Sequence, residues 1–194
     1  MRSEQLASSV EVIILTGGAS RRFGEDKSNA VVNHHTLLER VAGAYEGHRL
    51  VIVGEPAEVD AIYVQEEPRF SGPLAAIERG LREIKSDLVV IQAVDMPLAH
   101  RVMPLLFSNL IHDAALAMDA EGFLQPLAGL YRTDILRSVL RDFDTLENMP
   151  VKKLLEKLEL DVVNEADIQV FLSDIDTPSD LESMKDIITK YDAQ

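Results

Sequence analysis

The sequence of 194 residues has no cysteine and few basic side chains, with 19 lysine and arginine residues against 33 aspartate and glutamate residues. Without cysteine the chain has no disulfides, thiolate metal sites, iron–sulfur clusters or cysteine nucleophile. The formal net charge of −14 argues against a nucleic-acid-binding surface, because contact with a phosphate backbone needs a basic field. Any polyphosphate ligand would therefore need a local basic pocket.

Long apolar runs are missing as well. The polar start MRSEQLASS lacks the apolar core of a signal peptide, and no later run approaches the length that spans a bilayer. Together with the lack of cysteine, this predicts a soluble cytoplasmic protein with no membrane partner. At this length one domain with a single core is the default. We expect residues 1–9 to form a flexible N-terminal arm and residues 10–191 to form that domain.

Short apolar runs and amphipathic segments follow one another along the chain. The runs VEVIIL, LVIVG, DLVVIQAV, AALAM and PLAGLY are near-continuous, as strands covered on both faces are. TLLERVAGAY, PLAAIERGLREI, VMPLLFSNLIH and DILRSVLRDF place apolar residues three and four apart, which predicts helices. This pattern predicts a Rossmann-like three-layer α/β fold with a mostly parallel sheet. Ligands bind such sheets beyond the carboxyl ends of the strands.

The first predicted strand leads into the glycine-rich segment LTGGASRRFGEDK. It is not a Walker A motif, because Glu25 and Asp26 separate Gly24 from Lys27, and it is not a dinucleotide fingerprint, which needs Gly at Ala19. Both of these common phosphate loops are therefore excluded.

Anion binding nevertheless remains the favoured interpretation of this segment. Gly17 and Gly18 would let backbone N–H groups approach an anion closely, and Arg22 and Lys27 would neutralise its charge. The segment would then be a nucleotide cradle of a third type. The alternative is a tight turn between strand and helix with solvated charges.

Carboxylates follow two other segments. Asp95 comes directly after DLVVIQAV, where it would hold a hard cation such as Mg²⁺ or simply begin a turn. Asp174 and Asp176 are two apart on an extended segment and would face the same side, so they would complete a metal site with Asp95. The alternative is a helix start, which explains Thr177 to Asp180 but not the two upstream aspartates.

Five segments of the chain resemble one known family. LTGGASRRFGEDKS is similar to the L-x-G-G-x-S-x-R-M-G-x-D-K signature of the molybdenum cofactor nucleotidyltransferases, especially the guanylyltransferases that join GMP from GTP to molybdopterin. SGPLAAIERGL, VDMPL, QPLAGLYR and DIDTPSDL are similar to later segments of that family, in the same order. The five segments span Leu15 to Leu181, so the resemblance covers nearly the whole chain.

The resemblance implies a nucleotidyltransferase domain and a role for each matching residue. The implied nucleotide-binding residues are Leu15, Thr16, Gly17, Gly18, Lys27, Glu67, Gly72, Pro73 and Asp95. The implied catalytic residues are Lys27, Asp95 and Arg22, and Asp95 would hold Mg²⁺. The implied acceptor side comprises Gln125, Pro126, Asp174 and Asp176.

The implied reaction is Mg²⁺-dependent transfer of GMP from GTP to molybdopterin. Molybdoenzyme apo-proteins or other cofactor-biosynthesis proteins would be further partners. Because the glycine-rich segment would contact only the triphosphate, three alternatives stay open. They are a CTP-dependent molybdopterin cytidylyltransferase, a sugar-phosphate nucleotidyltransferase and a catalytically silent nucleotide-binding adaptor.

The chain departs from the family pattern at several positions. His34 stands where the family has Gly, and we expect this position to need a left-handed backbone, which His adopts at a cost. His34 and His35 would point to opposite faces of an extended segment, so a two-histidine metal site is not expected. Thr16 stands where the family usually has Ala.

Overall fold

The computed structural model describes residues 10–16 and 27–192. The expected N-terminal arm, residues 1–9, lies outside this described part, as do Gly17, Gly18 and Arg22. A seven-stranded sheet has the order β5–β4–β1–β6–β8–β7–β9. Its strands are β1 (Val10–Leu15), β4 (Leu50–Val53), β5 (Ile62–Val64), β6 (Leu88–Ala93), β7 (Ala114–Met118), β8 (Leu124–Arg132) and β9 (Leu160–Val163).

The sheet is parallel except for one strand. β1 pairs in parallel with β4 and β6, β4 with β5, and β7 with β9, whereas β8 is antiparallel to both β6 and β7. The prediction of a mostly parallel sheet is confirmed. The sequence did not predict the two edge strands, because β5 and β9 have only three and four residues and are partly exposed.

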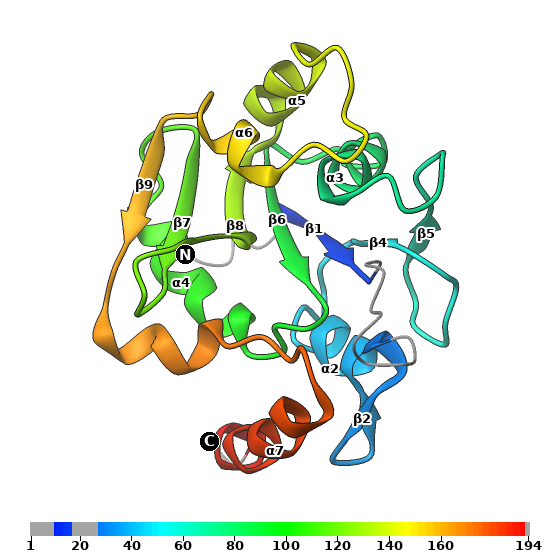
Figure 1. Ribbon diagram of the computed structural model, residues 1–194, viewed down its shortest axis with the longest axis vertical. Coiled ribbons are helices and arrows are strands. Elements are labelled where there is room, and N and C mark those ends of the chain that lie inside the picture. The colour runs from blue at the N-terminus through cyan, green and yellow to red at the C-terminus, as the bar shows by residue number, and fades with distance from the viewer. Residues whose placement is uncertain (1–9, 17–26, 193–194) are drawn as a thin grey trace.

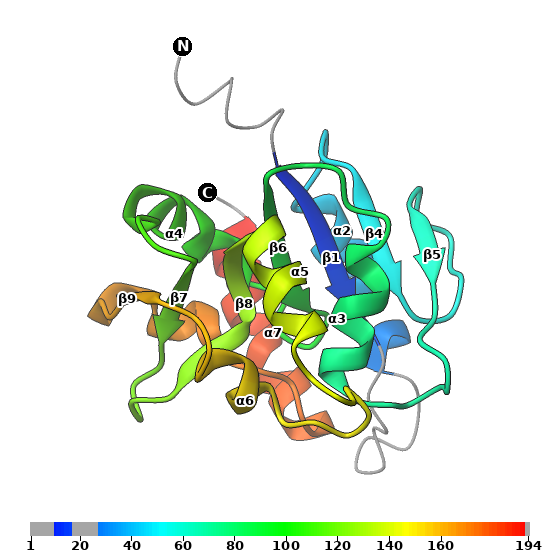
Figure 2. The ribbon, with the colours of Figure 1, turned by 90° about the horizontal axis from the view of Figure 1, so that it is seen from above.

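Helices cover both faces of the sheet, as Figures 1 and 2 show. One face is covered by α2 (Leu37–Gly43), α4 (Met103–Asn109) and α7 (Pro178–Asp192), with the 3-10 helices η2 (Ala99–Val102) and η3 (Ala166–Leu172). The other face is covered by α3 (Pro73–Leu81), α5 (Thr133–Arg141) and α6 (Val151–Leu155). Val12 and Ile14 of β1 pack toward the first layer, and Ile13 and Leu15 pack toward the second. This alternation confirms the three-layer prediction.

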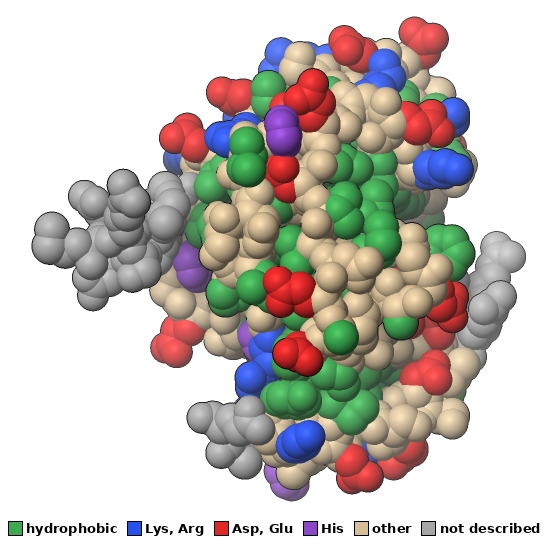
Figure 3. Space-filling view, turned by 90° about the vertical axis from the view of Figure 1, so that its left-hand side faces the viewer, with side chains coloured by type: hydrophobic (Ala, Val, Ile, Leu, Met, Phe, Trp, Pro, Cys, Tyr) green, Lys and Arg blue, Asp and Glu red, His purple; other side chains and the backbone are tan. Residues whose placement is uncertain are grey.

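The sheet ends at β9 on the side of the molecule seen in Figure 3, where hydrophobic side chains form patches between single acidic ones. Asp161 of β9 accepts hydrogen bonds from the N–H groups of Ile111 (2.6 Å) and His112 (2.7 Å). The Asp161 carboxylate thus fastens this edge strand to the segment before β7. Within the described residues, no helix combines the length and apolarity needed to cross a bilayer.

A small hairpin joins the glycine-rich segment to α2. Its strands are β2 (Val31–Val32) and β3 (His35–Thr36), and the two residues between them, Asn33 and His34, have φ values of 49° and 71°. Two positive φ values are the mark of a tight hairpin turn, for which Gly is favoured. The expectation of a left-handed backbone at His34 is confirmed.

Replacing His34 with glycine is expected to stabilise the fold by about 0.5–1 kcal/mol. The left-handed conformation costs an L-residue roughly 1–2 kcal/mol, and the greater freedom of Gly in the unfolded chain offsets part of the gain. Urea unfolding of His34→Gly would measure the change. His35→Gly is the matched control, because His35 lies in a strand, where Gly should destabilise by about 0.5–1 kcal/mol. A loss of stability in His34→Gly would contradict this account.

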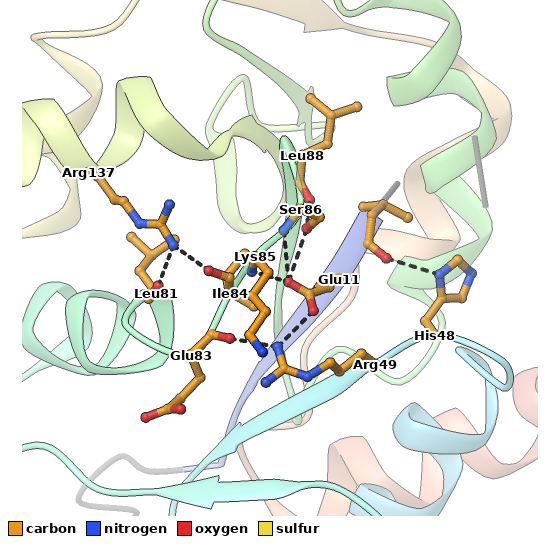
Figure 4. Close-up of polar contacts among 11 residues, drawn as sticks. Glu11, His48, Arg49, Leu81, Glu83, Ile84, Lys85, Ser86, Leu88 and Arg137 are labelled. Carbon is orange, nitrogen blue, oxygen red and sulfur yellow. Dashed lines mark hydrogen bonds and ion pairs between the residues drawn. The ribbon is translucent and has the colours of Figure 1, made fainter. Parts of the chain in front are cut away.

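A charged network lies at the amino end of the sheet, away from the carboxyl ends of the parallel strands (Figure 4). The buried Glu11 accepts hydrogen bonds from Nη1 of Arg49 (2.7 Å) and the backbone N–H groups of Lys85 and Ser86. Burial alone would raise the pKa of Glu11. The bonds from Lys85, Arg49 and Ser86 outweigh burial and hold this pKa below its usual range.

Replacing Glu11 with glutamine is expected to lower the free energy of unfolding by about 2–3 kcal/mol at pH 7, because charge-assisted hydrogen bonds are lost. A depressed pKa contributes stability above the unfolded value of about 4.3, and this contribution disappears as the pH falls through the folded pKa. The difference between parent and Glu11→Gln should therefore shrink below about pH 4. Urea unfolding at several pH values would test this. Glu78→Gln is the control, since its exposed pair with Arg82 should be worth about 0–1 kcal/mol.

Candidate active site

Three neighbouring strands bring the chain to one edge of the sheet. β1 ends at Leu15, whose partners in register are Val53 at the end of β4 and Ala93 at the end of β6. The chain segments that follow these three strands therefore begin side by side at this edge of the sheet. In open α/β sheets this edge is where ligands bind.

A buried lysine lies between two aspartates at this edge. Lys27 belongs to the 3-10 helix η1 (Lys27–Asn29), and only 10% of its side chain is exposed. Its Nζ lies 2.5 Å from Oδ1 of Asp176 and 3.4 Å from Oδ2 of Asp95. We call these three residues the Lys27 cluster. The fold thus brings together three of the residues that the sequence singled out.

A backbone hydrogen bond aligns the two acidic segments. Ile175 is fully buried and donates its N–H to the carbonyl oxygen of Asp95 at 2.9 Å. This bond holds the flanking Asp174 and Asp176 beside Asp95. Asp174 is exposed, and the structure gives it no direct contact with the Lys27 ammonium, although its charge acts on Asp95.

The sequence did not reveal the buried pair that supports the Asp95 turn. Gln92 of β6 donates from Nε2 to the carbonyl oxygen of Met96 at 2.9 Å and accepts a hydrogen bond from the hydroxyl of Tyr45. Gln92 is fully buried, and burial raises the pKa of Tyr45. An isolated Gln in an apolar strand was the available signal, because a buried amide needs partners.

The pKa shifts in the Lys27 cluster show that Lys27 only partly offsets the burial of the Asp95 carboxylate. Burial raises the pKa of Asp95, the nearby Lys27 opposes this, and the charges of Asp174 and Asp176 add to it. Burial acts against the charge of Lys27, but its hydrogen bond to Asp176 and the field of Asp95 raise the pKa of Lys27 overall. Both pKa values are therefore raised, that of Asp95 by burial and that of Lys27 by its two carboxylate partners. Lys27 therefore does not fully offset the cost of burying the negative charge of Asp95, and a second cation bound to its carboxylate would stabilise that charge.

The donor chemistry of the cluster is compatible with Mg²⁺. Among residues 10–16 and 27–192, no three His, Asp or Glu side chains form a complete metal site. Asp95 and Asp176 nevertheless converge on one cation, the ammonium of Lys27. Mg²⁺ usually takes one or two carboxylates and fills its remaining positions with water and substrate phosphates. Two hard oxygen donors therefore fit this ion.

The start of α7 confirms the helix-capping interpretation of Thr177 to Asp180. Oδ2 of Asp180 accepts from the N–H of Thr177 at 2.7 Å, and the N–H of Asp180 donates to Oγ1 of Thr177 at 3.2 Å. The hydroxyl of Thr177 also donates to Oδ2 of Asp180 at 2.9 Å, and this bond together with the one from the Thr177 N–H holds the pKa of Asp180 below its usual range. Capping and the approach of Asp176 to Lys27 thus occur together.

Thr16 uses its side chain to join β1 to β4. Its Oγ1 donates to the carbonyl oxygen of Val53 at 3.1 Å, and its N–H donates to the same oxygen at 3.2 Å. A Cβ on Gly54 would lie 1.7 Å from Oγ1 of Thr16, so only Gly fits there. Thr16 therefore packs between strands, while the carbonyl of Leu15 accepts from Val94 at 3.0 Å.

The predicted base-side residues lie around the start of α3. Gly72 precedes the helix with φ 91°, and Pro73 is its first residue. Glu67 is exposed and lines a cavity of about 620 Å³ between α3, α5 and the segment 143–147. The prediction that Pro73 begins a helix is confirmed.

The predicted acceptor-side residues Gln125 and Pro126 lie in the half-exposed first part of β8. Because β8 is antiparallel to β6, this part lies toward the edge where β6 ends. Nε2 of Gln125 donates to Oδ2 of Asp119 at 2.6 Å, and the carbonyl of Pro126 accepts from the hydroxyl of Tyr131 at 2.6 Å. Both residues are thus held in place by contacts outside the Lys27 cluster.

Residues 12–162 match the family described as the MobA-like NTP transferase domain. The chain belongs to this family. The family range contains Lys27 and Asp95 but ends before Asp176, which α7 and its preceding segment bring to the cluster.

Similar proteins agree with membership of the MobA-like family. The chain is 36% identical over 145 residues to a probable molybdenum cofactor guanylyltransferase of Mycobacterium avium, covering 66% of this chain and 72% of that protein. The crystal structure of molybdopterin-guanine dinucleotide biosynthesis protein A from Archaeoglobus fulgidus has a TM-score of 0.74 at 21% identity and covers 93% of this chain and 99% of that one.

The same fold also occurs in a protein named for a different nucleotide. The 2-C-methyl-D-erythritol 4-phosphate cytidylyltransferase of Thermus thermophilus has a TM-score of 0.64 at 17% identity, covering 91% of this chain and 98% of that one. At this identity the likeness shows the fold alone. The fold by itself therefore does not select the base.

Proposed function

We propose that this chain transfers GMP from GTP to molybdopterin and releases pyrophosphate. The observation that carries this proposal is the Lys27 cluster, in which a buried cation and two carboxylates meet at the carboxyl edge of the sheet, where the glycine-rich segment leaves β1. The guanylyltransferase name of the relative at 36% identity supports GTP as the donor and molybdopterin as the acceptor.

In the proposed reaction, the terminal phosphate of molybdopterin attacks the α-phosphorus of GTP. A new P–O bond forms to the acceptor oxygen, the bond between the α-phosphorus and its bridging oxygen to the β-phosphate breaks, and pyrophosphate leaves with that electron pair. A phosphate monoester is already anionic near neutral pH, so the reaction needs no strong general base. Catalysis then consists mostly of alignment and charge neutralisation.

Each member of the Lys27 cluster has a part in this scheme. Lys27 would move its ammonium from the two carboxylates to the triphosphate and stabilise the charge that develops on pyrophosphate. Asp95, assisted by Asp176, would hold Mg²⁺, which supplies Lewis-acid charge stabilisation when bound. The glycine-rich segment and Arg22 are proposed to contribute N–H groups and a second positive charge.

A nucleotide titration tests the donor. The purified chain would be titrated by calorimetry with GTP, CTP, ATP and UTP, each with and without Mg²⁺. We expect preferential binding of GTP that Mg²⁺ strengthens, followed by pyrophosphate release when molybdopterin is added. A preference for CTP would instead identify a cytidylyltransferase. Nucleotide binding without turnover, whether molybdopterin or a sugar phosphate is added, would identify an adaptor.

A further inference from the structure

Phe70 is an exposed aromatic residue in an unfavourable backbone conformation. It lies between β5 and α3, its φ is 62°, and 69% of its surface is exposed. A left-handed backbone is rare for a bulky residue, and an exposed ring forgoes the free energy of burial. Backbone strain of this kind persists only where the surroundings enforce it, and it gathers at ligand sites.

Contacts on both sides of Phe70 enforce this conformation. The N–H of Phe70 donates to Oε1 of Glu66 at 2.9 Å, and the carbonyl of the next residue, Ser71, accepts from the N–H of Asn148 at 2.7 Å. Nη1 of Arg69 donates to Oε1 of Glu55 at 2.7 Å. These bonds fix the backbone around Phe70 and leave its ring facing solvent.

The same contacts place Phe70 along the ligand-binding edge. Arg69 reaches Glu55, which follows Gly54, and Gly54 packs directly against Thr16 at the exit of β1. β5 lies two strands from β1, or about 10 Å. The Lys27 cluster lies on the opposite side of β1, where β6 ends. A triphosphate that is held by Lys27 and extends across β1 and β4 would bring its nucleoside toward Phe70.

We propose that Phe70 is the surface on which the nucleobase of the bound triphosphate stacks. The inference rests on the proposed function, because it takes a nucleoside triphosphate as the ligand. A phenyl ring stacks on the π-face that every base has, so it adds affinity without reading hydrogen-bond donors or acceptors. Phe70 would thus favour a nucleotide over a free polyphosphate, and other groups would select the base.

The test compares the affinities of GTP and inorganic tripolyphosphate in calorimetric titrations with Mg²⁺. Phe70→Leu keeps an apolar side chain in the same left-handed backbone conformation but removes the π-face. Phe70→Tyr keeps the π-face. Phe123→Leu is the matched control, an identical change at a phenylalanine that is 62% exposed on the turn between β7 and β8. We expect Phe70→Leu to raise the Kd of GTP about tenfold and to leave the Kd of tripolyphosphate unchanged. Phe70→Tyr and Phe123→Leu should bind both ligands as the parent does.

A fourth variant separates binding from stability. Asn tolerates a left-handed backbone, so Phe70→Asn should raise Tm by about 2–4 °C while it weakens GTP binding. A residue with a merely structural role would show stability and affinity falling together.

Two results would overturn the inference and are distinguishable. If the parent prefers GTP to tripolyphosphate and Phe70→Leu shows the same preference, stacking on Phe70 is refuted while the proposed function stands. If the parent binds no nucleoside triphosphate, the proposed function fails, and the role of Phe70 fails with it.

Discussion

Asp95→Asn is expected to lower the rate of nucleotidyl transfer by about a hundredfold or more, the usual cost of removing one electrostatic stabiliser. Asparagine keeps the size of the side chain and one oxygen but loses the charge that would hold Mg²⁺. Initial rates of pyrophosphate release at saturating GTP would measure the effect. Asp134→Asn is the control, since Asp134 lies on α5 with 91% of its side chain exposed.

Stability gives this prediction a second readout. Burial raises the pKa of Asp95 in the folded chain, so ionised Asp95 is less favourable there than in the unfolded chain. Its ionisation therefore lowers stability as the pH rises above the unfolded aspartate value of about 3.9. The neutral Asn lacks this cost, so at pH 7 Asp95→Asn should have a Tm no lower than that of the parent. A folded Asp95→Asn with full turnover would refute the assignment of Asp95.

The sequence was informative where one pattern has one structural outcome. Continuous apolar runs such as VEVIIL and AALAM correspond to β1 and β7, residue for residue. The rule that ligands bind at the carboxyl edge of the sheet then located Lys27 and Asp95 correctly relative to the strands. The resemblance, which has Gly where His34 stands, likewise implied the positive φ that His34 adopts.

The remaining features depend on contacts between distant segments, which no local pattern encodes. The contact of Lys27 with Asp176 joins residues 149 positions apart and depends on the hydrogen bond from Ile175 to Asp95. Phe70 was not predicted, because nothing in PRFSG forces a left-handed phenylalanine. Its conformation comes from Glu66 and from the neighbouring contact of Ser71 with Asn148.

Lys27→Met is expected to reduce turnover by about a hundredfold or more and to remove the only positive charge of the Lys27 cluster. Met has a similar length and no charge, so the triphosphate loses a cation while the space stays filled. Affinity for tripolyphosphate should therefore fall as well. Lys152→Met, at an exposed position on α6, is the control and should leave both quantities unchanged.

The same variant tests whether Lys27 occupies the place of a metal ion in the ligand-free chain. Its ammonium binds Asp176 and Asp95, so its removal takes away the cation that these two neighbouring carboxylates share. We expect Lys27→Met, in the absence of nucleotide, to bind Mn²⁺ more tightly than the parent does in a titration followed by electron paramagnetic resonance. Unchanged Mn²⁺ affinity would show that Lys27 does not compete with a divalent cation.

The pH dependence of stability completes this last prediction. The pKa of Lys27 is raised in the folded chain, so its charge contributes stability that is fully present below the unfolded lysine value of about 10.4. That contribution is lost as the pH rises through the still higher folded pKa. Lys27→Met should therefore be less stable than the parent at pH 7, and the difference should narrow only above about pH 10.4. Urea unfolding at pH 7, 9 and 11 would measure this difference, and a difference that narrows between pH 7 and 9 would contradict the pairing of Lys27 with its two aspartates.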